Sequence, residues 1–327
     1  GKNFRYVTTG FRNAYDITMA PDGDIFVYDS DMEWDMGAPW YRPTRINLAT
    51  DGGELGWRSG SANNPPTMVD TQPALVDIGP GSPTGSALGL GAKFPAKYQR
   101  AFFACDWTYA TLYAIHLKPE GGSWAATKEV FAGGKPFSLT DVVIRPQDGQ
   151  MYVTIGGRGS QSALYRIFYE GSESTAPVEW YESTKEQKLR RQLEAMRLQP
   201  PSTATLSKAW PNMGNPDRWV RYAARLAIEA QPLEAWRDLV KQQHPNNDLA
   251  INAALALARC GSKNDLEAIL TCLDQVNASK PNLATQRDVM RVMQVAFSRH
   301  GMPSAERAQT IGVDAAKRLP SGDNILD

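Results

Sequence analysis

Two stretches of the chain, DITMAPDGDIFVY (residues 16–28) and DVVIRPQDGQMYV (residues 141–153), follow one pattern. Each has a short apolar run, a turn containing an Asp-Gly pair, and a second run that carries aromatic residues. Asp-Gly between β-branched and aromatic runs is a strong signal for a β-hairpin. Self-similar hairpins are typical of β-propeller blades, so the pattern predicts a fold built from repeated sheets.

Four more apolar runs lie between these hairpins and are separated by Gly, Asp and Pro turns. We expect them to form four antiparallel strands of one complete blade. At about 40 to 50 residues per blade, residues 1–170 would supply three to four blades of a β-propeller. An open ring leaves an unpaired edge, so missing blades are expected from the same polypeptide or another chain. The four runs are residues 85–90, 101–106, 111–117 and 123–131.

After residue 183 the apolar residues recur with a helical period. The run PDRWVRYAA, which begins at Pro216, has Pro at the helix start and apolar residues on one face. Successive helix pairs are about 30 to 37 residues apart, near the period of HEAT-like solenoids. The sequence thus predicts a linker over residues 171–182 and HEAT-like α-helical repeats over 183–327. The expected helices are residues 183–198, 216–231, 232–243, 247–260, 264–276, 283–300 and 304–319.

Composition excludes several classes of protein. Lys plus Arg and Asp plus Glu each total 35, so no basic surface for nucleic acid is indicated. Apolar runs are far shorter than the roughly 20 residues of a transmembrane helix. The three cysteines of the chain form neither C-x-x-C nor C-x-x-C-H, so no zinc knuckle or haem motif is present. The start at Gly1, without Met or a signal peptide, predicts an internal fragment of a longer protein.

Several motifs of the first half resemble glucose/sorbosone dehydrogenase propellers, and they occur in that family's order. They are GFRNAYD (residues 10–16), RINL (45–48) through Gly56-Trp57, PTG (83–85) through KFP (93–95), ACDW (104–107) and LYRI (164–167). With helical repeats following, the chain looks like the secreted "membrane-bound dehydrogenase" proteins of planctomycetes and verrucomicrobia. Those proteins often carry a cytochrome c domain.

The resemblance implies a six-bladed propeller that binds pyrroloquinoline quinone and calcium. It implies oxidation of a sugar or sugar aldehyde by hydride transfer to the quinone, electron transfer to a cytochrome, and a periplasmic or secreted location. Arg12 matches the Arg of the family's Gly-His-Arg-Asn run, where the His is replaced by Phe11. Thr108 lies near the position of the family's cofactor-binding Lys. The expected cofactor-binding residues are Arg12, Asn13, Trp107 and Thr108.

The family's catalytic His belongs to an earlier blade that this chain lacks. The three histidines present, His116, His244 and His300, lie in a predicted outer strand and at the ends of predicted helices. None of them is expected to replace the catalytic base, so the catalytic residue is unknown from the sequence.

Aromatic residues crowd into the loops of the first half. Their rings can stack on sugars, and neighbouring Arg and Asp side chains can bind hydroxyls. The alternative is packing between blades, which uses most aromatic residues of a propeller. The expected substrate-binding residues are Trp34, Trp40, Arg58 and Asp106.

An acidic loop follows the first hairpin. Its carboxylates could surround calcium, which takes about six to eight oxygen ligands. The alternative is a solvated loop in which Asp residues cap turns. The expected metal ligands are Asp29, Asp31, Glu33 and Asp35. The run Gly156-Gly157-Arg158-Gly159 lacks the Lys and helix of a phosphate loop and predicts a turn between strands.

Three functions remain open at this stage. The first is an oxidoreductase acting on a sugar. The second is a non-catalytic propeller that binds carbohydrate or protein and is carried on a helical scaffold. The third is a structural subunit of an extracytoplasmic electron-transfer assembly.

Overall fold

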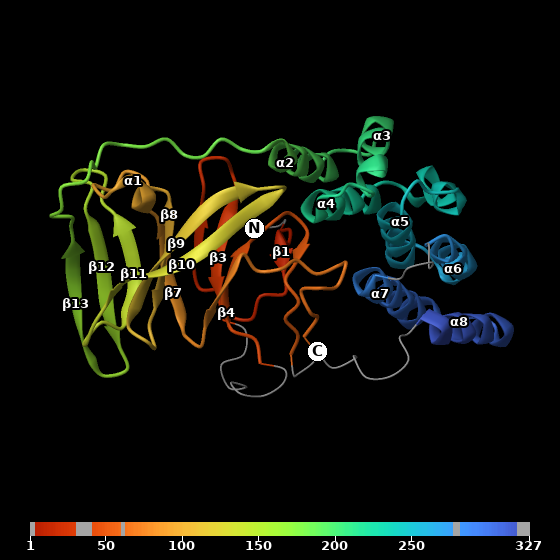
Figure 1. Ribbon diagram of the computed structural model, residues 1–327, viewed down its shortest axis with the longest axis horizontal. Helices are drawn as coiled ribbons and strands as arrows, with labels where there is room; N and C mark the ends of the chain where they lie inside the picture. Colours follow the sequence, from red (N-terminus) through yellow and green to blue (C-terminus); the bar gives the residue numbers. More distant parts are fainter. Residues whose placement is uncertain (1–3, 31–40, 60–62, 277–281, 319–327) are drawn as a thin grey trace. The chain divides into compact units, whose positions relative to one another are not determined.

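The computed structural model describes residues 4–30, 41–59, 63–276 and 282–318 (Figure 1). The chain divides into two compact units, residues 1–188 and 189–327. Strands dominate the first unit and helices the second. We call the first the sheet unit and the second the helical unit.

Sheet I is formed by the first hairpin and two further strands in the order β2-β3-β4-β6, all antiparallel. The short strands β1 and β5 pair in parallel beside it. The bounds are β1 Thr8–Thr9, β2 Ile17–Met19, β3 Ile25–Asp29, β4 Thr44–Leu48, β5 Gly53–Glu54 and β6 Val76–Gly79.

Sheets II and III repeat this arrangement in chain order, as the successive strands in Figure 1 show. Sheet II has four antiparallel strands, which confirms the prediction for residues 85–131. Sheet III has three antiparallel strands and includes the second predicted hairpin. Their elements are β7 Pro83–Leu88, α1 Ala96–Gln99, β8 Ala101–Asp106, β9 Thr111–Glu120, β10 Ser123–Gly133, β11 Leu139–Ile144, β12 Met151–Gly157 and β13 Ser160–Ile167.

A hydrogen bond from the glycine closes each of the two self-similar hairpins, over one residue more in sheet III than in sheet I. In sheet I the N–H of Gly23 donates to the carbonyl of Ala20 at 2.9 Å; in sheet III that of Gly149 donates to Arg145 at 2.8 Å. Both glycines have positive φ, 91° and 68°, a conformation that disfavours side chains with a Cβ. The sequence therefore predicted both hairpins and the glycine in each turn correctly, and the turn of sheet III is one residue longer.

Aromatic and aliphatic side chains fill the spaces between adjacent sheets. Between sheets I and II, the ring of Phe26 lies 6.0 Å from that of Phe102 and 5.7 Å from that of Trp124. Between sheets II and III, the buried core includes Phe103, Leu112, Val142, Met151 and Val153. The sheets thus pack face to face, with one continuous apolar layer at each interface.

The segment after β13, expected to be a linker, is extended and is bound to sheet II. Buried Gln99 donates to the carbonyl of Ala176 at 2.8 Å and accepts from the N–H of Val178 at 3.1 Å. The ring of Trp180 lies 5.5 Å from that of Trp124. We call residues 174–184 the strap. Its hydrogen bonds fix the chain along the sheet unit.

The helical unit is a series of helices in which α3 packs on α4, α4 on α5, and α5 on α6 and α7. Ser202, Asp217, Asn246 and Asn282 cap α3, α4, α5 and α7 with their side-chain oxygens. None of the helices in the described ranges is long and apolar enough to span a membrane. The bounds are α2 Lys185–Arg197, α3 Thr203–Asn212, α4 Arg218–Glu229, η2 Leu233–Ala235, η3 Arg237–Lys241, α5 Asn247–Cys260, η4 Lys263–Asp265, α6 Leu266–Asp274, α7 Leu283–His300 and α8 Ala305–Arg318.

Two helix predictions differ from the structure. Residues 232–243 form two short 3₁₀ segments, η2 and η3, with fully buried Trp236 between them. Its indole donates to the carbonyl of Gln231 at 3.3 Å, an anchor that periodicity does not reveal. Helix α3 was not expected, because Pro211 lies inside it and its first turn contains Thr203 and Thr205, which are weak helix formers.

Candidate functional site

The second strands of the three sheets end on the same side of the sheet unit. Sheets I and II are aligned where these strands begin, since the rings of Phe26, the second residue of β3, and Phe102, the second residue of β8, lie 6.0 Å apart. Trp107, which follows β8, donates from Nε1 to the carbonyl of Gly156 in β12 at 2.6 Å. The last residues of β3, β8 and β12 are Asp29, Asp106 and Gly157. We call the residues at these ends, Arg12, Asn13, Asp29, Asp106, Trp107 and Thr108, the strand-end site.

Asp29 holds the turn that precedes sheet I. Its side chain is fully buried, and it accepts the backbone N–H groups of Arg12 at 3.3 Å and Asn13 at 2.9 Å. The Arg12 guanidinium in turn donates to the hydroxyl of Ser30 at 3.2 Å. Buried Arg45 lies 4.0 Å from the Asp29 carboxylate. The structure therefore brings Arg12, Asn13 and Asp29 together through Asp29.

Asp106 repeats this role in sheet II. Its Oδ1 accepts the N–H groups of Ser82 at 3.1 Å, Thr108 at 2.9 Å and Tyr109 at 3.2 Å. Its side chain is fully buried, and Oδ2 has no hydrogen-bond partner among the described residues. Burial raises the pKa of this carboxyl, and its three N–H bonds act in the opposite direction. The buried Asp106 carboxylate thus fixes the turn after β8 through its bonds to the backbone of Thr108 and Tyr109.

Trp107 and Thr108 lie on the turn that Asp106 shapes. The guanidinium of Arg158 stacks over the Trp107 ring at 5.0 Å from its centroid. Thr108 is exposed, and its hydroxyl donates to that of Ser82 at 2.8 Å. Arg158 lies in the predicted Gly-rich turn, between β12 and β13, which confirms that prediction. The roles of Arg158 and Ser82 escaped the sequence reasoning because no local motif links them to Trp107.

The other predicted ligands are placed differently. Arg58 forms an ion pair with Glu54 at 2.9 Å and also donates to the carbonyl of Trp57. Its guanidinium is therefore already bound to groups of this chain. Trp34 and Trp40, predicted to bind substrate, lie outside the described residues. So do Asp31, Glu33 and Asp35, predicted to bind calcium. Within the described ranges no group of three potential metal ligands was found.

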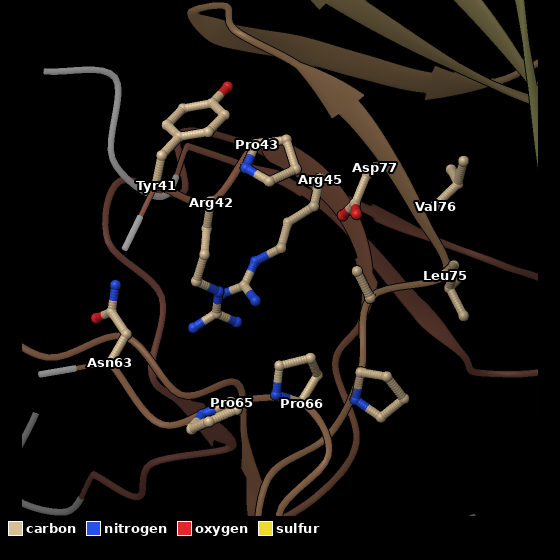
Figure 2. Close-up of a pocket in the computed structure, with 12 residues that line it drawn as sticks. Tyr41, Arg42, Pro43, Arg45, Asn63, Pro65, Pro66, Leu75, Val76 and Asp77 are labelled. Atoms are coloured by element: carbon tan, nitrogen blue, oxygen red, sulfur yellow. The ribbon is translucent and has the colours of Figure 1, made fainter. Parts of the chain in front are cut away.

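A pocket of about 620 Å³ lies beside β4 and β6 (Figure 2). Figure 2 shows the guanidinium groups of Arg42 and Arg45 next to one another in this pocket. Arg45 donates to the carbonyl of Leu55 at 3.0 Å, and Arg42 to that of Asn64 at 3.3 Å. Both arginines therefore hold the loops that form the wall. Burial, followed by nearby Tyr109 and Asp77, raises the pKa of Tyr41 at the rim.

All three histidines have structural partners away from the strand-end site. His116 of β9 pairs with Glu129 of β10 at 2.6 Å in sheet II. Nε2 of His244 lies 3.1 Å from the carbonyl of Val240. Nε2 of His300 lies 2.9 Å from the carbonyl of Ala258. Whether any of them takes part in catalysis stays a prediction.

Comparisons with known proteins give partial structural likeness only. No family model and no curated protein matches the chain. A glucose dehydrogenase described as a putative oxidoreductase, from Thermus thermophilus, is 22% identical with a TM-score of 0.38, over 49% of this chain and 46% of that one. The PQQ-bound aldose sugar dehydrogenase of Streptomyces coelicolor is 15% identical with a TM-score of 0.36, over 49% and 44%.

A third solved structure, the apo-form of the soluble aldose sugar dehydrogenase from Escherichia coli, is 15% identical with a TM-score of 0.35. It matches over 45% of this chain and 42% of its own length. The chain therefore spans less than half the length of each of these proteins.

Proposed function

We propose that the sheet unit is part of a β-propeller in an oxidoreductase-like, extracytoplasmic protein, and that it binds a sugar or sugar aldehyde at the strand-end site. One observation carries the proposal. Asp29 and Asp106, which end equivalent strands of adjacent sheets, each hold a turn through backbone N–H groups. Those turns carry Arg12 on one sheet and Trp107 and Thr108 on the next.

These groups suit a polyhydroxylated ligand. A guanidinium and a hydroxyl bind sugar oxygens, and an indole provides an apolar surface for sugar C–H groups. Because buried carboxylates fix the turns, the donors are held before the ligand arrives, which lowers the entropy cost of binding.

The proposal includes a cofactor at the strand-end site. Arg12 and Arg158 are cations that would hold the carboxylates of pyrroloquinoline quinone, and Thr108 would supply a hydroxyl. When bound, the quinone would accept the hydride. Asp29 is the expected calcium ligand that the structure describes, and its two oxygens accept N–H bonds from Arg12 and Asn13. A proton acceptor, the missing blades and a cytochrome partner would come from elsewhere in the polypeptide or from another chain.

The second candidate is a non-catalytic module that binds carbohydrate or protein. Departures from the family's motifs favour it, since Phe11 stands where the family has His and Thr108 lies near the position of its cofactor-binding Lys. In this reading the chain binds a sugar without turnover. The third alternative, a structural subunit of an electron-transfer assembly, predicts haem in the intact assembly and no sugar binding.

Calorimetric titration of the full-length natural protein with pyrroloquinoline quinone, with and without calcium, tests the cofactor. Oxidation of aldoses with a dye acceptor tests the reaction. We expect Arg12→Ala to weaken quinone and aldose binding by about tenfold or more, through lost charge-assisted bonds. Arg145→Ala is the matched control, because Arg145 is exposed at the β11–β12 turn and pairs with Asp148.

Aldose binding without turnover, and without quinone binding, would establish the binding module. If neither aldose nor quinone binds the natural protein, the sugar site is disproved. Equal losses in the two arginine variants would show that the effect is not specific to the strand-end site.

A further inference from the structure

The pocket beside β4 and β6 has the size and the walls of a small-molecule site (Figure 2). Its volume of about 620 Å³ lies within the range of about 300 to 1,000 Å³ that ligand pockets occupy. Prolines line much of it, and because each fixes its own backbone φ, the wall is stiff. A stiff wall lowers the entropy cost of binding a ligand. These prolines are Pro43, Pro65, Pro66 and Pro73.

One backbone carbonyl holds the two arginines of this pocket together. Nη2 of Arg42 donates to the carbonyl oxygen of Leu55 at 3.4 Å, and Nη2 of Arg45 donates to the same oxygen at 3.0 Å. Arg42 also donates through Nη1 to the carbonyl of Asn64 at 3.3 Å. The two guanidinium groups are therefore held next to one another, as Figure 2 shows.

Two guanidinium groups that share one acceptor are suited to an oxyanion. Each is a planar fork of N–H donors that matches a carboxylate, and an anion between them relieves the repulsion of their charges. The Arg45 side chain is 3% exposed, so water screens its charge little.

The nearby Asp29 carboxylate offsets the charge of Arg45 only in part. It lies 4.0 Å from Arg45, whereas a charge-assisted bond is about 2.7 to 2.9 Å long. Its two oxygens accept the backbone N–H groups of Arg12 and Asn13. An anion that enters the pocket therefore meets both guanidinium groups.

The rest of the lining selects among anions. Asp77 lies opposite Arg45 in the register of β4 and β6, lines the pocket and is exposed. Its charge repels a dianionic phosphate more strongly than a monoanionic carboxylate, and its oxygens accept hydroxyl groups. The proline rings offer apolar surface to C–H groups. The pocket therefore suits a monoanion that also carries hydroxyl groups.

We propose that this pocket binds a hydroxylated carboxylate, such as a uronic acid, with its carboxylate between Arg42 and Arg45 and a hydroxyl on Asp77. The shared Leu55 carbonyl carries the argument, because it fixes two cations side by side in a cavity of ligand size. Arg42, Arg45 and Asp77 are not part of the strand-end site, so binding here does not require an aldose there.

Calorimetric titration of the natural protein with glucuronate tests the pocket. We expect glucuronate to bind, and excess glucose, which lacks the carboxylate, not to displace it. Arg42→Gln should weaken glucuronate binding by about tenfold or more, through loss of charge-assisted bonds. Arg145→Gln is the matched control, because Arg145 pairs with Asp148 outside the pocket and its side chain is 52% exposed.

Asp77→Asn gives a second readout at an exposed position. Glucose 6-phosphate should gain about threefold more affinity than glucuronate in this variant, because the lost charge repels the dianion most strongly. Thermal unfolding checks that each variant is folded. Where Arg42→Gln does not fold, an unchanged preference between the two anions in Asp77→Asn overturns the proposal.

Absence of glucuronate binding to the natural protein would also overturn it. So would displacement by glucose, which would place glucuronate in the strand-end site, or equal losses in Arg42→Gln and Arg145→Gln. Glucuronate binding that depends on Arg42, in a protein that binds neither aldose nor quinone, would disprove the sugar site at the strand ends and support this pocket.

Discussion

Trp124 and Asp24 meet inside the sheet unit although they are 100 residues apart in the sequence. The indole Nε1 donates to Oδ2 of Asp24 at 2.7 Å, and both side chains are buried. Asp24 belongs to the turn of the first hairpin, and Trp124 is the second residue of β10, an edge strand of sheet II. This bond, together with the contact between Trp124 and Phe26, fixes sheet I against sheet II.

Loss of this bond should destabilise the sheet unit. We expect Trp124→Phe to lower the free energy of unfolding by about 2 kcal/mol, because a buried carboxylate loses a charge-assisted donor. Denaturant unfolding followed by tryptophan fluorescence and circular dichroism measures the change. Trp180→Phe is the control, since the buried Nε1 of Trp180 has no partner among the described residues. A loss as large in Trp180→Phe would show that ring packing, and not the bond, is responsible.

The close approach of sheets II and III makes Gly85 sensitive to substitution. Gly85→Ala should cost about 2 to 3 kcal/mol, because the added Cβ overlaps the backbone of Asp141. Gly134→Ala, where the nearest atom is 3.8 Å away, should be nearly neutral. Urea unfolding of both variants compares the costs. Equal midpoints would mean that the sheets can separate without penalty.

Loss of the Gln99 side chain should loosen the strap more than it destabilises the sheets. Gln99→Ala removes the bonds to Ala176 and Val178 and also one to the carbonyl of Phe94 at 2.8 Å. We expect faster amide exchange over residues 174–184, by about tenfold for each 1.4 kcal/mol of lost anchoring. Hydrogen-exchange mass spectrometry measures it, with exposed Gln147→Ala as the control. Unchanged exchange in the strap would assign the anchoring to the aromatic contacts of Trp180.

Asp288 should make the stability of the helical unit depend on pH. Burial raises its pKa to about 6, nearby Asp248 adds to the rise, and Arg218 and Arg221 oppose it. Because the folded pKa lies above the unfolded value of about 3.9, ionisation is harder in the folded state. The penalty is absent below pH ~4, grows as pH rises to about 6 and is constant above.

Asp288→Asn removes this penalty. We expect it to stabilise the helical unit by about 1 kcal/mol at pH 7, after allowance for partial solvent screening, and not at pH 4. Thermal unfolding at both pH values measures the difference. Asp238→Asn is the control, because Asp238 is exposed and its pKa is lowered mainly by a hydrogen bond from Lys241. A gain of the same size at both pH values would contradict the assigned pKa.

Local signals in the sequence predicted the elements well where a turn or cap fixes them. The turns at Gly23 and Gly149 and the four strands of sheet II formed where the patterns indicated. Helices α5 and α7 have the expected bounds, since Asn246 and Asn282 cap their first turns. The short 3₁₀ segments around Trp236 were missed, because burial of a large side chain decided their geometry.

The sequence named individual residues of the candidate site but did not predict how the fold arranges them. The resemblance selected Arg12, Trp107 and Thr108 one at a time. Only the fold shows that Asp29 and Asp106 hold the turns that carry them. Asp106 was expected to bind substrate directly, a role that stays untested, and the structure places its carboxylate beneath the turn.

The sequence by itself determined the local repeats: hairpins with a strand period of two, and helices with a period of 3.6 bounded by caps. These depend on neighbours only a few residues away. Tertiary structure alone decided which strand ends meet, how Asp16 reaches Ser86, and where Gln99 binds the strap. Those contacts join residues 70 and 77 positions apart, and their partners are chosen by close packing of whole sheets, which no local pattern encodes.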